Sequence, residues 1–345
     1  MSKFPQRPTL SDVAEAAGVS TVTVSRVIEG SAKVAEKTRV RVQDAMERIG
    51  YYGNAAASQL VSGRARTIGI VASNTADYGY AEAIRGIEKG ARALDLAVLI
   101  VVIEGTDSDS VRKAVSTVAS HALAGVIVID FDSAAHAVLP AIPEYIPVVS
   151  ATSPSEGSGV DRPYVSLDEY DGGRLAAQHL IDLGHRSIFV IAPPIEQPVE
   201  RRSLGVSDAL DEARLPHYPS SVASQWGPAA GYDCTTRLID DYGDRVTAIA
   251  CANDEVALGA LRALMDRGLR VPEDVSVIGF DDQPLAAYTA PALTTVHQDF
   301  LQLGEVAFAT LRAVIEARDL PEERHIRPSL VIRETTSAPH PERGL

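Results

Sequence analysis

The chain has 345 residues, of which 46% are hydrophobic and 23% charged, so it is long enough for more than one domain and has an ordinary globular composition. Its net charge of −14 disfavours a nucleic-acid partner for the chain as a whole, but the charge is unevenly distributed. Residues 1–66 carry a net charge of +4 and the remainder carries −18, which is typical of a basic head that contacts DNA and an acidic body that does not.

The lack of a recognisable targeting signal and the spacing of the cysteines indicate a reducing compartment. The N-terminal residues MSKFPQRPTL lack the apolar core of a signal peptide, and no apolar run approaches the length of a membrane span. Cys234 and Cys251 have no metal-ligand spacing and are expected to be buried free thiols. These features predict a cytoplasmic protein without a metal or cofactor.

Residues 9–28 have the pattern of two short helices joined by a tight turn. The apolar stripe of the first is formed by Leu10, Val13, Ala14 and Ala17. Gly18 breaks that helix, and Ser20 can cap the next one. On the second helix Val22 and Arg26 face outward, and the residues expected to face inward are Val24, Val27 and Ile28. The pattern predicts a helix-turn-helix, although a three-helix core without a ligand would share it.

A third helix and an Ala-rich segment follow. The apolar face of the third helix is formed by Thr38, Val42, Ala45, Met46 and Ile49, and Gly50 is placed to end it. Residues 54–61, NAAASQLV, could form a helix of two turns, which is marginal alone in water. This segment is therefore either a hinge helix that forms on DNA or a flexible linker.

From Thr67 onward, apolar strand-like runs alternate with amphipathic helical stretches. The runs are TIGIVAS, LAVLIVVIE, GVIVIDF, IPVVSAT, RSIFVIAP, TAIACAN and DVSVIGF. Continuous Val/Ile runs alternating with helices predict parallel sheets covered on both faces, and the length is too great for one such unit. Ligands of such sheets bind outside the carboxyl ends of the strands.

Several segments, in order, resemble one known family. They are TLSDVAEAAGVSTVTVSRVIEG and TRVRVQDAMERIGYYGNAAASQL in the head, and HLIDLGHRSIFVI, ANDEVALGALRALMDRGLRVPEDVSVIGFDD and PALTTVHQDFLQLG in the body. From about Thr9 to about Thr336 the chain resembles the lactose-repressor/galactose-repressor (LacI/GalR) family of transcription regulators. The resemblance implies an N-terminal all-α helix-turn-helix head and an α/β periplasmic-binding-protein-like (type I) body of two Rossmann-like subdomains.

The resemblance also implies the domain boundaries. The helix-turn-helix head would occupy residues 1–53 and the hinge helix or linker 54–66. The effector-binding and dimerisation domain would occupy 67–336, and the Pro-rich tail 337–345 is expected to be disordered. Within the body, subdomain N would comprise about 67–167 and 299–327, and subdomain C about 168–298 and 328–336.

Four residues of the second helix are candidates for reading DNA. The methyl groups of Thr21 and Val22 suit a thymine methyl, and Arg26 can clamp a guanine edge with two hydrogen bonds. Ser20, at the helix N-terminus, suits a phosphate. Because one helix-turn-helix reads one half-site, the expected partner is a pseudo-palindromic double-stranded operator bound by a homodimer.

The resemblance adds contacts in the hinge and four departures from the family. Leu60 matches the residue that the family wedges between base steps of the minor groove, with Asn54 and Ala57 beside it. The departures are Glu29 where Asn is frequent, Ala35 where Ser often caps the third helix, Gly53 where Pro is usual, and Thr152 where an Asp often follows the strand.

The candidate effector site lies at the predicted strand ends and consists of Ser73, Arg202, Trp226, Asn253, Asp281 and Phe300. Arg, Asn and Asp side chains can bind adjacent hydroxyls, and an aromatic wall can pack on a pyranose ring. The set suits a neutral sugar or glycoside better than a flat base or an anion. Alternatively, Asn253 and Asp281 could cap helices, and Trp226 could belong to the core.

Motifs of catalysis are missing from the sequence. It has no His-Glu-x-x-His pair, no Gly-x-Ser-x-Gly elbow and no phosphate-binding loop of the Gly-x-x-x-x-Gly-Lys type, so no enzyme is expected. The sequence predicts a homodimeric repressor whose operator affinity is controlled allosterically by a small sugar-like effector. The alternatives are a solute-binding protein with an unrelated head, and a regulator that responds to a nucleobase or a protein partner.

Overall fold

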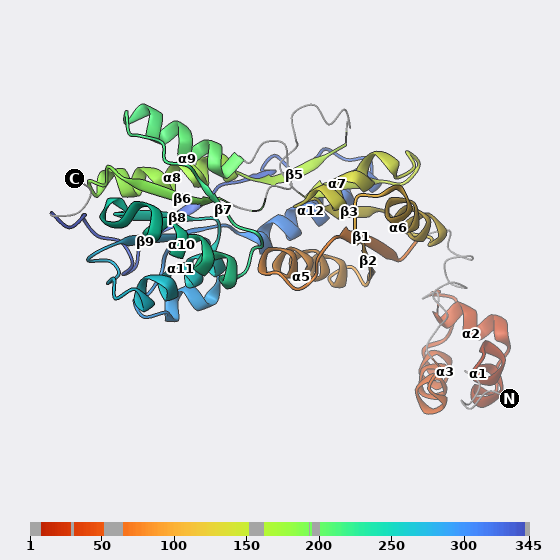
Figure 1. Cartoon of the computed structure of the whole chain (residues 1–345). Coiled ribbons are helices and arrows are strands. Elements are labelled where there is room, and N and C mark those ends of the chain that lie inside the picture. Colours follow the sequence, from red (N-terminus) through yellow and green to blue (C-terminus); the bar gives the residue numbers. More distant parts are fainter. Residues whose placement is uncertain are drawn as a thin grey trace. The chain divides into compact units, whose positions relative to one another are not determined.

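The computed structural model describes residues 8–28, 31–51, 65–151, 162–192, 194 and 201–341. The chain divides into two compact units, Met1–Arg66 and Thr67–Leu345, each with a hydrophobic core of its own. The first unit contains only helices among these residues, and the second alternates strands with helices (Figure 1). Within the described ranges, none of the helices combines the length and apolar character that crossing a membrane requires.

The first unit consists of α1 (Leu10–Ala17), α2 (Thr21–Ile28) and α3 (Glu36–Ile49). α1 begins at a reciprocal cap, because the Thr9 hydroxyl accepts from the Asp12 amide and the Asp12 carboxylate accepts from the Thr9 amide at 2.7 Å. Gly18 ends α1 with a left-handed φ of 61°. The shared core is formed by Val13, Ala14, Ala17, Val24, Val27, Val42, Ala45 and Tyr51.

These three helices confirm the predicted helix-turn-helix and the helix that follows it. One inward position was wrong. Ile28 is 38% exposed, because it is the last residue of α2, whereas Val24 and Val27 are buried as expected.

The second unit contains two sheets. The strands of the first run in the order β11-β5-β4-β3-β1-β2 and are all parallel. They are β1 (Thr67–Ala72), β2 (Ala97–Val102), β3 (Val126–Ile129), β4 (Val148–Ala151), β5 (Tyr164–Leu167) and β11 (His325–Ile326). The accompanying helices are α5 (Tyr78–Arg92), α6 (Ser108–Ser120), α7 (Ser133–Val138), η1 (Leu139–Ala141) and α12 (Phe300–Ile315).

The strands of the second sheet run in the order β12-β10-β9-β8-β6-β7, and only β12 pairs antiparallel. They are β6 (Ile188–Ala192), β7 (Ser221–Val222), β8 (Ala248–Cys251), β9 (Ser276–Asp281), β10 (Thr294–His297) and β12 (Ser329–Val331). The accompanying helices are α8 (Glu169–Asp182), α9 (Arg201–Glu212), α10 (Pro228–Tyr242), η2 (Gly243–Arg245), α11 (Asp254–Asp266) and η3 (Pro284–Tyr288).

Each sheet is covered on both faces, which explains its apolar strands. Separate buried clusters lie on the two sides of the first sheet and on the two sides of the second. Alternating side chains of β1 point to opposite clusters, since Ile70 belongs to one and Val71 to the other. The predicted α/β body with parallel sheets is therefore confirmed.

The chain passes between the sheets three times. β5 belongs to the first sheet, and the next strand, β6, belongs to the second. After β10 the chain enters α12, whose Leu303 and Ala307 are buried in the core of the first sheet. β11 then pairs in the first sheet and β12 in the second. The connections lie at residue 168, at residues 298–299 and at residues 327–328.

The C-terminal segment differs from the predicted disordered tail in its first residue. His185, which is 1% exposed, bonds the Ser337 carbonyl through Nε2 at 2.9 Å and the Thr247 hydroxyl through Nδ1 at 3.1 Å. Burial lowers the pKa of this imidazole. A buried histidine needs partners, and Ser337 supplies one, so the described chain is held to the second sheet at this point. Cys234 and Cys251 are free and buried, as expected.

The N-terminus of α3 generates a prediction. Ala35 has the extended backbone of an N-cap, with φ −61° and ψ 141°, but offers no side-chain acceptor. Ala35→Ser should stabilise the helix by about 1 kcal/mol and slow hydrogen exchange of its first-turn amides about fivefold in the full-length protein.

The matched control is Ala16→Ser, which adds the same hydroxyl to the exposed side of α1. It should leave the exchange of α3 unchanged. Equal exchange in the Ala35→Ser variant and the wild type would show that water already satisfies the start of α3.

Candidate functional site

The four candidate DNA-reading residues of α2 are all exposed. Val22, with 56% of its surface accessible, and Arg26 lie on the side of the helix opposite the buried Val24 and Val27. An apolar side chain this exposed on a short helix is available to a base methyl group.

Ser20 has a local role in addition to the predicted one. Its Oγ accepts from the Thr23 amide at 3.2 Å, and the two hydroxyls are 2.9 Å apart. Ser20 therefore caps α2, and its hydroxyl is already engaged in the free protein. The helix N-terminus itself still offers amides to a phosphate. The hinge candidates Asn54, Ala57 and Leu60, and the departures at Glu29, Gly53 and Thr152, lie outside the described residues.

Four effector candidates gather at one edge of the second sheet. Because β6, β7, β8 and β9 are parallel, their carboxyl ends lie on the same side. Trp226 follows β7, Asn253 follows β8, and Asp281 is the last residue of β9. Asn253 donates through Nδ2 to the Trp226 carbonyl at 3.2 Å and accepts the Val256 amide at 2.8 Å. Asn253 thus caps α11, as its alternative interpretation required. Trp226 is partly buried against the core.

Arg202 is buried beside these strand ends, with 7% of its surface exposed. Its Nη2 donates to Glu169 Oε1 at 2.9 Å, its Nη1 donates to the Ala252 carbonyl, and its guanidinium lies 3.7 Å from the centroid of the Phe280 ring. Gly205 allows this position, since a Cβ there would lie 2.0 Å from the Tyr170 carbonyl. The close approach of α9 to α8 brings the guanidinium to the carboxylate.

Asp281 has an unusual environment for a carboxylate. It is 8% exposed, and Gln298 Nε2 donates to its Oδ1 at 3.2 Å. Burial raises the pKa of Asp281 to about 7, although the charge of Arg202 opposes this. At neutral pH the group can therefore accept a hydrogen bond or, when protonated, donate one.

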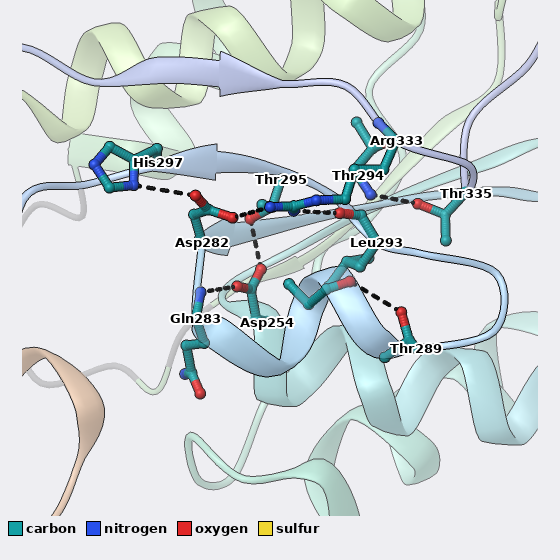
Figure 2. A network of polar contacts seen from close by, with 11 residues as sticks. Asp254, Asp282, Gln283, Thr289, Leu293, Thr294, Thr295, His297, Arg333 and Thr335 are labelled. Atoms are coloured by element: carbon teal, nitrogen blue, oxygen red, sulfur yellow. Dashed lines mark hydrogen bonds and ion pairs between the residues drawn. The ribbon is translucent and has the colours of Figure 1, made fainter.

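The backbone after β9 is held by a polar network (Figure 2). Asp281 and Asp282 have φ values of 100° and 55°, which L-residues rarely adopt. Asp254 holds Gln283, the residue after Asp282, because its Oδ2 accepts the Gln283 amide at 2.6 Å. Its Oδ1 accepts the Thr295 hydroxyl at 2.5 Å. Burial, and then the charge of Asp281, raise the pKa of Asp254 to about 8.

Arg333, which follows β12, completes the network. Its Nη2 donates to Asp282 Oδ1 at 2.6 Å and its Nη1 to the Leu293 carbonyl at 2.8 Å, while His297 Nδ1 lies 3.2 Å from Asp282 Oδ2 (Figure 2). The network joins the loop that carries Asp281 to the residues after β12 and to β10, which directly precedes the passage at residues 298–299.

The first sheet contributes Ser73, directly after β1, and Phe300, at the start of α12. Phe300 packs edge-to-face on Tyr78 and Phe131, with centroid distances of 6.0 and 5.8 Å. Ser73 Oγ contacts the Asp132 carboxylate and lies 2.8 Å from the Tyr80 hydroxyl.

Sequence reasoning missed Tyr78, Tyr80 and Asp132. The only signal in the sequence is that Asp132 follows the predicted strand GVIVIDF, which ends at Phe131.

Side chains at the carboxyl edge of one sheet interact electrostatically with side chains at the carboxyl edge of the other. Burial first, then Glu82, and then the charges of Asp281 and Asp282 raise the pKa of Tyr78 to about 12. Burial and the charge of Asp77 raise the pKa of Glu255. Residues that follow β1 therefore lie within electrostatic range of residues that follow β8 and β9. The six candidates fall into two groups, four on the second sheet and two on the first.

The buried carboxyl of Asp281 predicts a pH-dependent stability. Because its pKa rises from 3.8 to about 7 on folding, the native state keeps this proton while the unfolded state loses it. Wild-type stability should therefore fall as the pH rises from 4 to 7. Asp281→Asn removes that loss. Between pH 4 and pH 7, the free energy of unfolding in urea of the variant should therefore rise relative to that of the wild type by on the order of 2–4 kcal/mol. If the difference in unfolding free energy between the variant and the wild type stays constant from pH 4 to 8, the pKa of Asp281 is not raised by folding.

Comparisons with known proteins agree with this arrangement. Residues 9–54 match the model of bacterial regulatory proteins of the lacI family, and residues 177–336 match a periplasmic binding protein-like domain. The HTH-type transcriptional repressor PurR of Haemophilus influenzae is 33% identical and covers 96% of this chain and 99% of its own. The lactose operon repressor of Escherichia coli K12 is 32% identical, over 96% of this chain and 91% of its own.

Solved structures are similar over the same length. The lac repressor dimer bound to operator and the anti-inducer ONPF has a TM-score of 0.86 at 31% identity, covering 96% of this chain and all of that one. A complex of the transcriptional regulator CelR with cellobiose has a TM-score of 0.69 at 29% identity, covering 95% of this chain and all of that one. The chain therefore belongs to the lacI family of DNA-binding transcriptional repressors.

Proposed function

We propose that this repressor binds a pseudo-palindromic operator as a homodimer, and that a neutral sugar or glycoside bound between the carboxyl edges of the two sheets sets its operator affinity. Residues 1–53 would read the DNA, 54–66 would form the hinge, and 67–336 would bind the effector and dimerise. The effector would bind one arrangement of the two sheets more tightly and shift the population toward it.

The charge of the candidate effector site is the observation that carries the choice of a neutral ligand. Carboxylates dominate the described part of the two edges, which holds Asp77, Asp132, Glu169, Glu255, Asp281 and Asp282. Two of the cations here are already paired, Arg202 with Glu169 and Arg333 with Asp282. A phosphate or carboxylate ligand would meet repulsion and would have to break these pairs, whereas hydroxyl groups can bond to both partners.

The aromatic side chains favour a ligand with an apolar face. Trp226 lies on one edge and Tyr78, Phe131 and Phe300 on the other. A pyranose ring has such a face, and the CelR relative was solved with cellobiose. A nucleobase is the second candidate, because a ring could stack on the same side chains and the relatives include repressors named PurR.

A thermal-shift screen of the purified protein tests the ligand class. The panel contains cellobiose, lactose, D-glucose, D-galactose, D-ribose, glucose 6-phosphate, hypoxanthine and guanosine. A neutral saccharide should raise Tm, because a ligand at 100 times its Kd stabilises the native state by about 2.7 kcal/mol. A shift with hypoxanthine and none with any sugar would favour the nucleobase.

Arg26 should read a base. With an operator selected from random sequences, Arg26→Ala should cost about 1–3 kcal/mol of binding free energy and relax the preference at one base pair. The charge-matched control is Lys37→Ala, at an exposed position of α3, which should weaken selected and random DNA alike. If Arg26→Ala loses the same binding free energy on selected and on random DNA, the Arg26 side chain contacts only phosphate.

Leu60 should act as a wedge in the minor groove. Leu60→Ala should reduce both operator affinity and the bending angle measured by fluorescence transfer between labelled DNA ends. Binding to random DNA should change much less, since that binding is mainly electrostatic. If the bending angle is unchanged in Leu60→Ala, Leu60 does not insert at the centre of the operator.

A further inference from the structure

Three oxygen atoms from separate elements meet at the carboxyl edge of the first sheet. The Tyr80 hydroxyl donates to Asp132 Oδ2 at 2.7 Å and lies 2.8 Å from Ser73 Oγ, which contacts the same Oδ2. Ser73 follows β1, Tyr80 lies in α5, and Asp132 precedes α7. The pairing of β1 with β3 brings residues about 59 positions apart into this cluster.

The Asp132 carboxylate is already saturated by its surroundings. Its Oδ1 accepts the amides of Ala134 and Ala135 at 2.9 and 3.0 Å, and so caps α7. Its Oδ2 contacts the hydroxyls of Ser73 and Tyr80. A carboxylate has about four acceptor positions, and all four are used.

The cluster contains fewer protons than contacts. Ser73 and Tyr80 each carry one hydroxyl proton, and a carboxylate carries none. Three oxygen–oxygen contacts therefore share two protons. When both hydroxyls donate to Asp132, no proton lies between Ser73 and Tyr80, and the Ser73 oxygen can only accept from a further group. The geometry makes Ser73 a hydrogen-bond acceptor whose polarity is fixed by Asp132.

We propose that Ser73, Tyr80 and Asp132 form a subsite that accepts a hydrogen bond from one effector hydroxyl and thereby selects effectors by the position of that hydroxyl. This inference rests on the proposed sugar effector and adds specificity determinants to it. The subsite would reject a group that only accepts, such as a phosphate oxygen, a carbonyl or a fluorine.

The surroundings of the cluster suit a sugar ring. Phe131, next to Asp132, packs on Tyr80 at a centroid distance of 4.9 Å and on Phe300 at 5.8 Å. Ser73 and Asp132 are partly buried, so they are shielded from bulk water without being sealed in the core.

Asp132→Asn should reverse the polarity of the subsite. Its Oδ1 can still cap α7, because Asn is as good an N-cap as Asp. Its Nδ2 would donate to the Ser73 and Tyr80 oxygens, which releases the Ser73 proton toward the effector. Ser73→Ala removes the acceptor altogether and is a second, smaller change that the fold should tolerate.

The matched control is Asp107→Asn. Asp107 caps α6 in the same way, since its Oδ1 accepts the amides of Asp109 and Ser110 at 3.0 Å and its Oδ2 accepts the Ser110 hydroxyl at 2.6 Å. These partners lie in its own turn, so the control repeats the substitution and the cap without the Ser73 and Tyr80 contacts.

The experiment measures Kd by calorimetry for cellobiose, lactose, D-glucose, D-galactose and D-ribose, and then for the monodeoxyfluoro analogues of the sugar that binds most tightly. In the wild type, fluorine at one position should weaken binding about 10-fold or more, because a hydrogen bond to a charge-linked acceptor is lost. Asp107→Asn should keep this penalty. In Asp132→Asn and Ser73→Ala, the penalty at that position should shrink to within about threefold.

Two results would overturn the inference, and they are distinct. If a sugar binds but wild type and both variants respond alike to every fluorine, the subsite is wrong and the sugar effector stands. If no neutral saccharide binds the wild type, the proposed effector class is wrong and the subsite falls with it.

Discussion

The parallel direction of the strands is the constraint on which the rest of the body depends. Among the described residues, nine of the ten strand pairings are parallel, so each sheet collects its carboxyl ends on one side. The strand interiors are mainly apolar. Polar side chains that could face a ligand stand where strands end, as Ser73, Asn253 and Asp281 do. Electrostatic interactions between residues after β1 and residues after β8 and β9 then show that the two edges lie close together.

A second constraint on the body is the cost of burying carboxyl groups beside the proposed effector site. Asp254 and Asp281 are both almost inaccessible, and burial is the largest cause of their raised pKa values. Hydrogen bonds from Thr295 and the Gln283 amide make Asp254 tolerable and at the same time fix a left-handed backbone at Asp281 and Asp282. Strain of this kind is commonly held at functional sites. The network of Figure 2 includes β10, which directly precedes the passage at residues 298–299, so a ligand on Asp281 would act close to a segment that connects the sheets.

The sequence predicted most of this architecture through local signals. Helical spacing and the break at Gly18 located α1, and unbroken Val/Ile runs located the parallel strands. A strand-end position pointed to Asp281, and the family resemblance pointed to Arg202; the structure places the two in electrostatic contact. The assignment of these residues to an effector remains a proposal.

What the sequence could not predict depends on long-range contacts. The Asp132 cluster requires β1 to lie beside β3, and no local pattern links residues 73 and 132. Ser337 looked like part of a Pro-rich tail, because the buried His185 that holds it lies 152 residues away. Ile28 had an inward spacing, but it ends α2 and leaves the core.

The central claim is that the effector and the operator are linked through the body of the repressor. The most direct test measures one full cycle with a selected operator and the saccharide that binds most tightly: operator Kd with and without sugar, and sugar Kd with and without operator. Linkage predicts that both ratios differ from one by the same factor, about 5- to 150-fold for typical allosteric coupling. A sugar that binds the free protein but leaves operator Kd unchanged would contradict the account.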